Sequence, residues 1–411
     1  MGAGMRPPVV VDLMAKALEN PDMLSLAAGF TDNALLPREA VREAAGALTA
    51  ADLPEEPLQY GTNRGRRRLR ELSRDWVGRY PGETPEAFDP GQFFVTNGSQ
   101  QALYLAVQVL CDPGDIVLVE APTYFVCLEM LKGLGVRAVG LPCDATGRID
   151  PEGMAERLRE LERAGERPRV KALYLVSYHA NPSSRSLSAA DKEAVARVLR
   201  GADWPMPVIE DAAYRDLYFE SPHPAPSVIG CGAFAGLPRL YLGTYTKPFA
   251  TGLKVGYGYC TEPDWLARML AVKGHHDFGT AHFNQAVVER VLERGRYAAH
   301  LRRVRPHNAA KAEALHQALA DGGLEAAGWR WRTPEGGLVF WLRGPEGLDL
   351  RMDSAFCRRC VEAGVLYVPG DLCLPGGAPW RCARLSHGSL DEPRLREAAR
   401  RFAAVAAEFA D

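Results

Sequence analysis

The chain has 411 residues, 47% hydrophobic and 24% charged, with 49 Lys and Arg against 51 Asp and Glu, which suggests two or so domains with a large buried core. The near-neutral balance gives no electrostatic reason to expect nucleic acid or an anionic membrane as a partner. No run of about 18 uncharged apolar residues is present, and the N-terminus lacks the apolar core of a signal peptide, so we expect neither a membrane span nor a leader.

Strand-like segments alternate with helix-like segments through the first two thirds of the chain. The expected strands are short β-branched or aromatic runs bounded by turn formers, at 115–122, 170–177, 207–213 and 239–245. Helical patterns fall at 99–111, after Tyr124, near 151–163 and near 188–200. This alternation predicts an α/β domain with a mostly parallel sheet. Ligands bind at the carboxyl ends of such strands, so residues just past 122, 177, 211 and 245 should matter most.

After about residue 285 the pattern changes. A long helical stretch, about 284–320, leads to the alternating segment WRWRTPEGGLVFWLRG, a helix, the strands LYVPG and RCARLSHGS, and a terminal helix from about 391. We interpret this part as a smaller α+β unit joined through a long helix. The predicted division is an N-terminal arm and part of the small domain at 1–45, a large domain at 46–285, and a small domain at 286–411.

Nine cysteines are scattered along the chain. An odd, dispersed set predicts reduced thiols in the cytoplasm and no disulfide framework. Cys357 and Cys360 form one CxxC, but the segment looks helical and lacks a second CxxC or a His pair at ligand spacing. We interpret these two cysteines as structural and not as a zinc or redox site.

Lys247 follows a predicted buried strand and is close to two hydroxyl residues, Thr244 and Thr246. A lysine at a strand end in a polar site can be desolvated, which lowers its pKa and lets it form a Schiff base with an aldehyde. A single lysine in a loop is more often a surface residue. The polar residues at the other strand ends are what favour the catalytic interpretation.

Asp211 and Tyr214 follow another predicted strand. A buried carboxylate needs a cationic partner, and the protonated pyridine nitrogen of pyridoxal phosphate is one such partner. Taken alone, Asp211 could equally be a helix N-cap. Asn181 lies in a turn fixed by Pro182; its amide could bind a phenolate oxygen, or it could be only a turn residue.

Gly98, Ser99 and Gln100 open a predicted helix directly after a strand. Backbone N–H groups at a helix start, with small residues that allow close approach, can bind an anion. An ordinary Asn-Gly turn with a serine cap explains the same residues equally well when the segment is taken in isolation.

Together these segments resemble the fold-type I pyridoxal-phosphate enzymes, specifically the class I/II aminotransferase family and its α-aminoadipate and kynurenine aminotransferase subgroup. The resemblance runs from LSLAAGFTDNALLP to RLSHGS. It implies a mostly parallel sheet of the aspartate-aminotransferase type with a smaller α+β C-terminal domain. It also implies pyridoxal 5'-phosphate as the cofactor.

The resemblance assigns roles around the cofactor ring. Lys247 is similar to the Schiff-base lysine and proton shuttle, and Asp211 to the partner of the pyridine nitrogen. Tyr214 and Asn181 resemble the donors to the phenolic oxygen. Tyr124 resembles the aromatic residue that stacks on the ring.

The resemblance also assigns roles toward the phosphate and the substrate. The implied phosphate cradle consists of Gly98, Ser99, Gln100, Thr244, Thr246 and Lys254. Tyr60 resembles the tyrosine that reaches the phosphate from the neighbouring subunit, which implies a homodimer with shared active sites. Arg384 resembles the arginine that clamps the substrate α-carboxylate through two hydrogen bonds, and Gly29 the glycine whose backbone lies over the substrate.

Several positions depart from the family pattern. Lys254 replaces the usual arginine and can neutralise phosphate without the fork geometry of a guanidinium. The usual Asn-Pro-Thr-Gly turn reads Asn-Pro-Ser-Ser from Asn181 onward. His179, which we assign to substrate binding together with Asn181, replaces a common glutamine. Further histidines fall near the expected site: His275, His276, His282 and His387.

The leading prediction is an aminotransferase that acts on an α-amino acid through an external aldimine and a quinonoid. The alternative is β- or γ-elimination or replacement, or oxidative deamination, in specialised metabolism; the additional histidines favour considering it. A transcriptional regulator with an aminotransferase-like domain is disfavoured, because the resemblance begins near Met1 and the net charge is near neutral. We expect a cytoplasmic enzyme with no nucleic-acid or membrane partner.

Overall fold

The central sheet of the large domain has seven strands, and all except the edge strand β4 are buried on most of their length. The computed structural model describes residues 22–50, 56–144, 147–376 and 381–410. Across the sheet the strands are β2 (Phe93–Asn97), β8 (Val255–Cys260), β7 (Arg239–Thr244), β6 (Val208–Asp211), β5 (Val170–Val176), β3 (Ile116–Glu120) and β4 (Arg137–Leu141). Strand β8 runs antiparallel to β2 and β7, and every other pair of neighbours in this sheet is parallel. The predicted α/β class with a mostly parallel sheet is confirmed.

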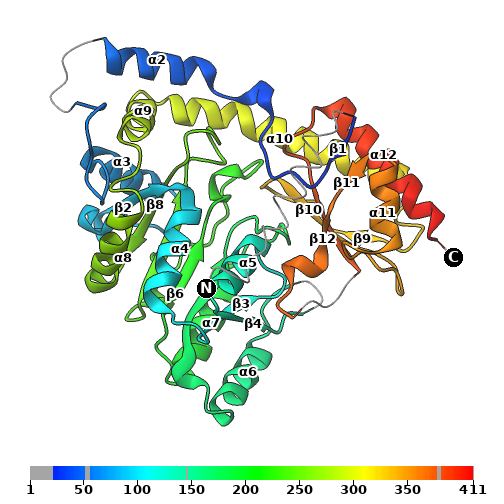
Figure 1. The fold of residues 1–411 in the computed structure, drawn as a ribbon, viewed down its shortest axis with the longest axis horizontal. Helices are drawn as coiled ribbons and strands as arrows, with labels where there is room; N and C mark the ends of the chain where they lie inside the picture. Colours follow the sequence, from blue (N-terminus) through cyan, green and yellow to red (C-terminus); the bar gives the residue numbers. More distant parts are fainter. Residues whose placement is uncertain (1–21, 51–55, 145–146, 377–380, 411) are drawn as a thin grey trace.

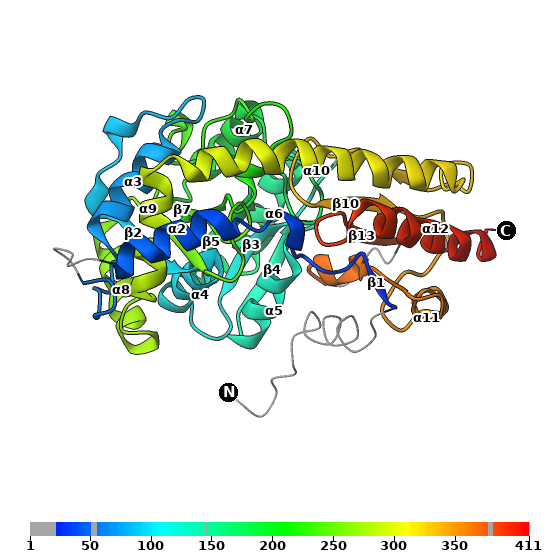
Figure 2. The same ribbon diagram turned by 90° about the horizontal axis from the view of Figure 1, so that it is seen from above.

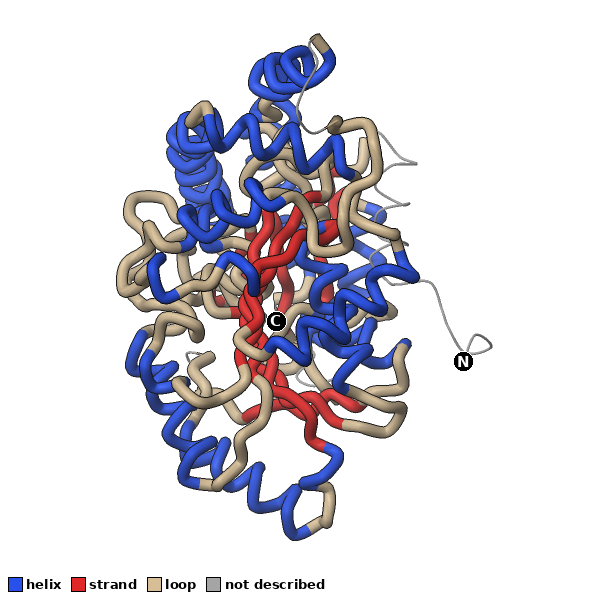
Figure 3. The backbone as a smooth tube through the Cα atoms, turned by 90° about the vertical axis from the view of Figure 1, so that its left-hand side faces the viewer, coloured by secondary structure: helices blue, strands red, loops and turns tan. Residues whose placement is uncertain are grey.

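Helices cover both faces of this sheet (Figure 3). They are α3 (Arg67–Val77), α4 (Gly98–Leu110), α5 (Phe125–Gly133), α6 (Pro151–Arg163), α7 (Ala189–Gly201) and α8 (Pro263–His276). The Asp150 side chain caps α6 by accepting from the Glu152 N–H, and Ser188 with Asp191 forms a capping box at α7. Since crossover helices return the chain to the same end of the sheet, the carboxyl ends of β3, β5, β6 and β7 share one edge.

The small domain is built on an antiparallel sheet. Its strands are, in order, β12 (Val368–Pro369), β13 (Cys382–Ser386), β10 (Val339–Arg343) and β9 (Arg330–Trp331). Helices α11 (Ala355–Glu362) and α12 (Glu392–Glu408) pack beside it (Figure 1). A short parallel pair, β1 (Leu24–Ser25) with β11 (Val365–Leu366), ties the N-terminal part of the described chain to this domain.

The long helical stretch predicted at 284–320 is two helices. Gly295, with a φ of 65°, separates α9 (His282–Glu293) from α10 (Arg296–Asp321). Glycine adopts this left-handed conformation without the steric cost that other residues meet. Helix α10 then extends from the large domain along the small one (Figure 2).

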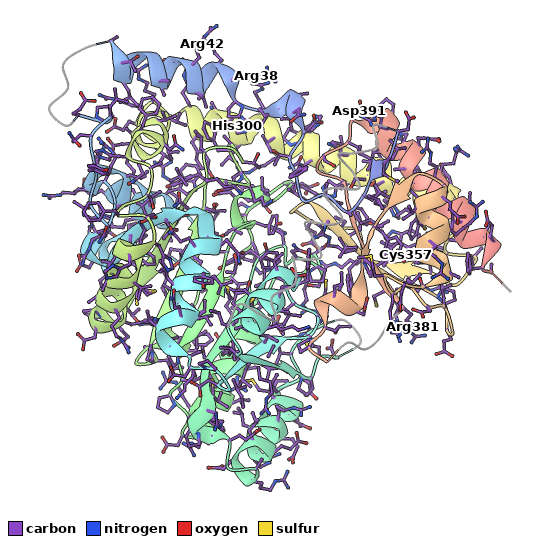
Figure 4. All side chains as sticks on the ribbon, in the orientation of Figure 1. Arg38, Arg42, His300, Cys357, Arg381 and Asp391 are labelled. Atoms are coloured by element: carbon purple, nitrogen blue, oxygen red, sulfur yellow. The ribbon has the colours of Figure 1, made fainter. Side chains whose placement is uncertain are left out.

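Helix α10 contributes side chains to two hydrophobic cores. Tyr297 and Leu301 belong to the large hydrophobic core, whereas Leu315 and Leu319 belong to the small one. Helix α2 (Arg38–Thr49) packs on α9 and buries Leu48 in the large core, while Arg42 projects from its exposed side (Figure 4). The boundaries at residues 45 and 285 stay a prediction, and we propose to shift them so that α2 and α9 belong to the large domain.

The two cysteines of the CxxC in α11 belong to the small-domain core. Figure 4 marks the position of Cys357. Cys357 and Cys360 are both buried, and burial raises the pKa of the Cys360 thiol. A buried thiol with a raised pKa is a poor nucleophile.

None of the helices within the described ranges is long and apolar enough to cross a membrane.

Candidate active site

Lys247 lies just past the carboxyl end of β7, in the turn Thr244–Lys247. Its Nζ donates to the Gly29 carbonyl oxygen at 2.7 Å. Burial, with smaller effects of the Lys254 and Arg384 charges, lowers the pKa of Lys247 to about 8. A substantial fraction of this amine is therefore neutral, and nucleophilic, at neutral to mildly basic pH.

Arg384 on β13 is almost fully buried, with 3% of its surface exposed. Its guanidinium donates from Nη1 to Asn181 Oδ1 at 3.2 Å and from Nη2 to the Ala27 carbonyl oxygen, while Nε has no partner. Within the described ranges, no carboxylate forms an ion pair with it. A buried guanidinium without a counter-ion is suited to receive an anion.

Asp211 ends β6 and is buried. Its carboxylate accepts hydrogen bonds from the Tyr174 hydroxyl at 3.0 Å and from the Ala213 N–H at 3.0 Å. Burial raises the pKa of Asp211 above its ordinary value despite these two donors. A cation beside the carboxylate would offset this desolvation. Tyr174 is a supporting residue that the sequence did not single out, because it lies in mid-strand.

Asn181 and Tyr214 lie together next to Arg384. The Tyr214 hydroxyl is hydrogen-bonded to the Asn181 side chain, and burial raises the pKa of Tyr214. Asn181, Tyr214 and Arg384 are all at least nine-tenths buried. The structure therefore brings together residues predicted from three distant segments.

The start of α4 is open to an anion. Gly98 has a φ of 67°, and the side chain of the N-cap residue, Asn97, makes no capping hydrogen bond to the helix. A Cβ on Gly256 of β8 would lie only 2.4 Å from the Gly98 carbonyl carbon, so this glycine allows the helix start to pack against the strand. The sequence did not identify Gly256, since its role depends on strand pairing.

Two threonines near Lys247 differ in what they bind. Thr244 Oγ1 donates to the Val255 carbonyl and accepts from the Thr246 N–H, so it holds the turn. Thr246 Oγ1 is buried without a partner and lies 3.4 Å from the position that a Cβ on Gly98 would take. This orphaned hydroxyl beside the open helix start fits a phosphate group.

A family model for class I and II aminotransferases matches residues 21–402. The chain belongs to this family. It is therefore a pyridoxal-phosphate-dependent transferase that acts on an amino acid, and the predicted fold type, cofactor and reaction class are confirmed. The elimination and oxidation alternatives find no support in the relatives described next.

Three relatives illustrate the similarity. The 2-aminoadipate transaminase of Thermus thermophilus is 31% identical over 98% of this chain and 94% of its own length. The aromatic-amino-acid aminotransferase 1 of Thermococcus litoralis is 29% identical over 97% and 91%. The crystal structure of a Pyrococcus horikoshii kynurenine aminotransferase with PMP superposes with a TM-score of 0.87 at 30% identity, covering 99% of this chain and 96% of that one.

The remaining predicted positions are Tyr124, Lys254 and Tyr60. Tyr124 precedes α5, and its pKa is raised by burial and then by the proximity of Tyr214 and Asp211. Lys254 is exposed and adopts a positive φ of 55°. Tyr60 is 79% exposed and meets Phe278 edge-on, with ring centroids 5.8 Å apart. Within this chain alone, Tyr60 is thus directed to the surface.

His179 and His387 are neutral, buried histidines. The His179 ring lies against Gly336, and its Nε2 has no partner. The His387 ring packs edge-on against Phe219 and Phe340. Burial lowers the pKa of each histidine to about 3.

This burial predicts acid sensitivity of the fold. Unfolded histidines bind protons near pH 6.5, so between about pH 6.5 and pH 3 the unfolded chain holds more protons than the folded one. The free energy of unfolding should therefore fall as the pH drops through this window. The free energy of unfolding can be measured by urea titration at pH 7 and at pH 5. The decrease between the two pH values should be smaller in His387→Phe than in wild type, whereas His275→Phe, at an exposed position, should show the wild-type decrease. Equal falls in wild type and His387→Phe would contradict this expectation.

Proposed function

We propose that this aminotransferase binds the amino acid between Lys247 and Arg384. The observation that carries the proposal is that carbonyl groups two residues apart, Ala27 and Gly29, contact the guanidinium and the amine. Two residues of extended chain span at most about 7 Å. The amine and the guanidinium therefore face one small space, as the amino and carboxylate groups of an α-amino acid require.

In this proposal each of the chain's groups has a defined task. Lys247 holds the cofactor covalently and, when displaced, moves the proton from the substrate Cα. Arg384 binds the α-carboxylate, and the Gly29 backbone covers the substrate. Bound pyridoxal phosphate supplies the electron sink and carries the amino group. Asp211 balances the charge of the ring nitrogen.

The other assigned residues position the cofactor. Tyr214 and Asn181 donate to its phenolic oxygen, and Tyr124 stacks on the ring. We assign the phosphate to the N–H groups of Gly98, Ser99 and Gln100, the Thr246 hydroxyl and the Lys254 ammonium, with Thr244 shaping the turn. His179 stays a proposed substrate contact through its unpartnered Nε2.

The test of this function is a half-reaction with single amino acids. Purified holoenzyme mixed with a substrate, without an acceptor, should lose its visible cofactor absorption, release one equivalent of the 2-oxo acid and retain the nitrogen on the cofactor. A 2-oxo acid added afterwards should restore the spectrum. Release of ammonia with an unchanged spectrum would contradict transamination.

We propose that the enzyme is a cytoplasmic homodimer whose active sites are shared. Support comes from the exposed pair Tyr60 and Phe278, with Leu58 also 71% exposed, since large exposed apolar side chains mark interaction surfaces. A reducing compartment agrees with nine cysteines that are present as thiols.

The shared site predicts complementation between subunits. Lys247→Ala subunits mixed with Tyr60→Phe subunits should, after exchange, form about a quarter of all sites with both residues intact. Activity should then exceed the average of the two separate parents. Mixing Lys247→Ala with Lys247→Arg subunits is the matched control and should regain nothing. Demonstrated exchange without gain would refute the shared site.

A further inference from the structure

A partly buried carboxylate outside the assigned site, Asp277, is hydrogen-bonded to the residues that flank the start of α4. Asp277 follows the last residue of α8. Its Oδ2 accepts from the Gln101 side-chain amide at 2.9 Å and from the Asn97 side-chain amide at 3.1 Å. Gln101 Oε1 in turn accepts from the Asn97 N–H at 2.8 Å. The side chains of Asp277 and Gln101, with the backbone N–H and side-chain amide of Asn97, thus form a closed hydrogen-bonded ring next to the first turn of α4.

This ring explains why the helix start is open. An asparagine at an N-cap ordinarily turns its side chain onto the N–H groups of the first turn, which would occupy the donors that an anion needs. Here the Asn97 amide donates to Asp277, and no side-chain cap forms at α4. The N–H groups of the first turn therefore stay available for the phosphate.

The negative charge of Asp277 is neutralised on its other side. Lys273 Nζ, whose side chain is fully buried, donates to both carboxylate oxygens at 2.8 and 3.0 Å. Burial alone would raise the pKa of Asp277, but the donors Lys273 and Gln101 hold it below its ordinary value. Asp277 thus remains ionised as an acceptor for both amides, while Lys273 limits its repulsion of a nearby phosphate.

The segment after Asp277 is fixed to the same strand that precedes α4. The Gly279 N–H donates to Asp277 Oδ1 at 3.0 Å, and Thr280 Oγ1 donates to the Val95 carbonyl of β2 at 3.4 Å. The position of the Asp277 carboxylate is therefore held by both β2 and α8. A carboxylate held in this way can orient the start of α4.

We propose that Asp277 is a positioning residue for the cofactor phosphate: through Asn97 and Gln101 it keeps the first turn of α4 uncapped and oriented. This inference rests on the proposed phosphate cradle. Asp277 makes no contact with the cofactor in this proposal. Loss of the Asp277 side chain should therefore weaken binding of the phosphate group specifically.

The experiment compares the binding of pyridoxal phosphate and pyridoxal to the apoenzyme by equilibrium dialysis. Asp277→Ala should raise the Kd of pyridoxal phosphate about tenfold, the scale seen when residues that orient ligating groups are lost, and leave the Kd of pyridoxal unchanged. Asp277→Asn, which retains one acceptor oxygen for the two amides but loses the negative charge, should have a smaller effect. Asp264→Ala, which removes an exposed carboxylate at the other end of α8, should change neither constant.

Two further variants separate this inference from the cradle itself. The effects of Gln101→Ala and Asp277→Ala on the binding free energy of pyridoxal phosphate should not be additive, because both substitutions break the same hydrogen-bonded ring. Thr246→Val tests the cradle directly. If Thr246→Val weakens binding of pyridoxal phosphate but Asp277→Ala does not, or if Asp277→Ala weakens both ligands equally, the positioning role is wrong. If neither variant affects pyridoxal phosphate, the cradle assignment is wrong as well.

Discussion

Replacing Lys247 with alanine should lower kcat by on the order of 10⁴-fold or more, because the variant loses both the proposed covalent attachment point and the proposed proton-transferring amine. Borohydride reduction of the wild-type holoenzyme should attach the cofactor to Lys247, as read by peptide mass spectrometry. Lys247→Arg retains a positive charge but not a titratable amine, so it should be equally inactive. Attachment of the cofactor to another lysine in wild type would remove Lys247 from this role.

The lowered pKa of Lys247 gives this prediction a pH dependence. Only the neutral amine attacks an aldehyde, so capture of pyridoxal phosphate by the apoenzyme should quicken about tenfold per pH unit below pH 8 and level off above it. The charge of Lys254 contributes to this lowering. Lys254→Gln should therefore shift the midpoint of this rise in capture rate to higher pH. Lys254→Arg, which retains the charge, should leave the midpoint unchanged.

The informative quantity in that experiment is the pH at which the capture rate reaches half of its plateau value. Lys254 is also a proposed phosphate ligand, so the absolute capture rate should change in both variants. Stopped-flow absorbance between pH 6 and pH 10 would separate the two effects. An identical midpoint in Lys254→Gln and wild type would show that the Lys254 charge does not act on Lys247.

The residues at the strand ends could be predicted because their signals are local. Asp211 and Lys247 each follow a run of buried strand residues, and parallel strands place such positions at one edge. The order of the strands was not needed for that conclusion. The helix break at Gly295 was missed, although a glycine within an Ala- and Arg-rich stretch is a recognisable stop signal.

The residues that support the site could not be predicted in this way. Tyr174 and Gly256 act through strand neighbours, and Asp277 acts through a ring of amides from β2 and α4. Each of these roles depends on which elements pair in space. Similarly, Thr244 and Thr246 are alike in sequence, and only the hydrogen bond of Thr244 to Val255 shows which hydroxyl remains available.

Arg384→Ala should reduce kcat/KM for α-amino acids by about 30-fold or more. A buried charge pair that loses one partner costs about 2–5 kcal/mol, and about 1.4 kcal/mol corresponds to tenfold. Arg384→Lys should recover only part of the loss, since an ammonium cannot form two parallel hydrogen bonds with a carboxylate. The visible spectrum of the holoenzyme should change little, because Arg384 is assigned to the substrate and not to the ring.

The structure also identifies the competing explanation for such a loss. Arg384 binds Asn181 and the Ala27 carbonyl, so its removal could instead loosen the cofactor site. Comparing amino acids with their decarboxylated amines separates the two effects: loss of the clamp reduces only the carboxylate-bearing substrates, whereas a loosened site reduces both. Arg381→Ala, three residues earlier in the chain and paired with the exposed Glu346, is the matched control and should leave kcat/KM unchanged. Equal losses of kcat/KM for amino acids and amines in Arg384→Ala would show that Arg384 maintains the structure of the site. That result would contradict its assignment to the substrate carboxylate.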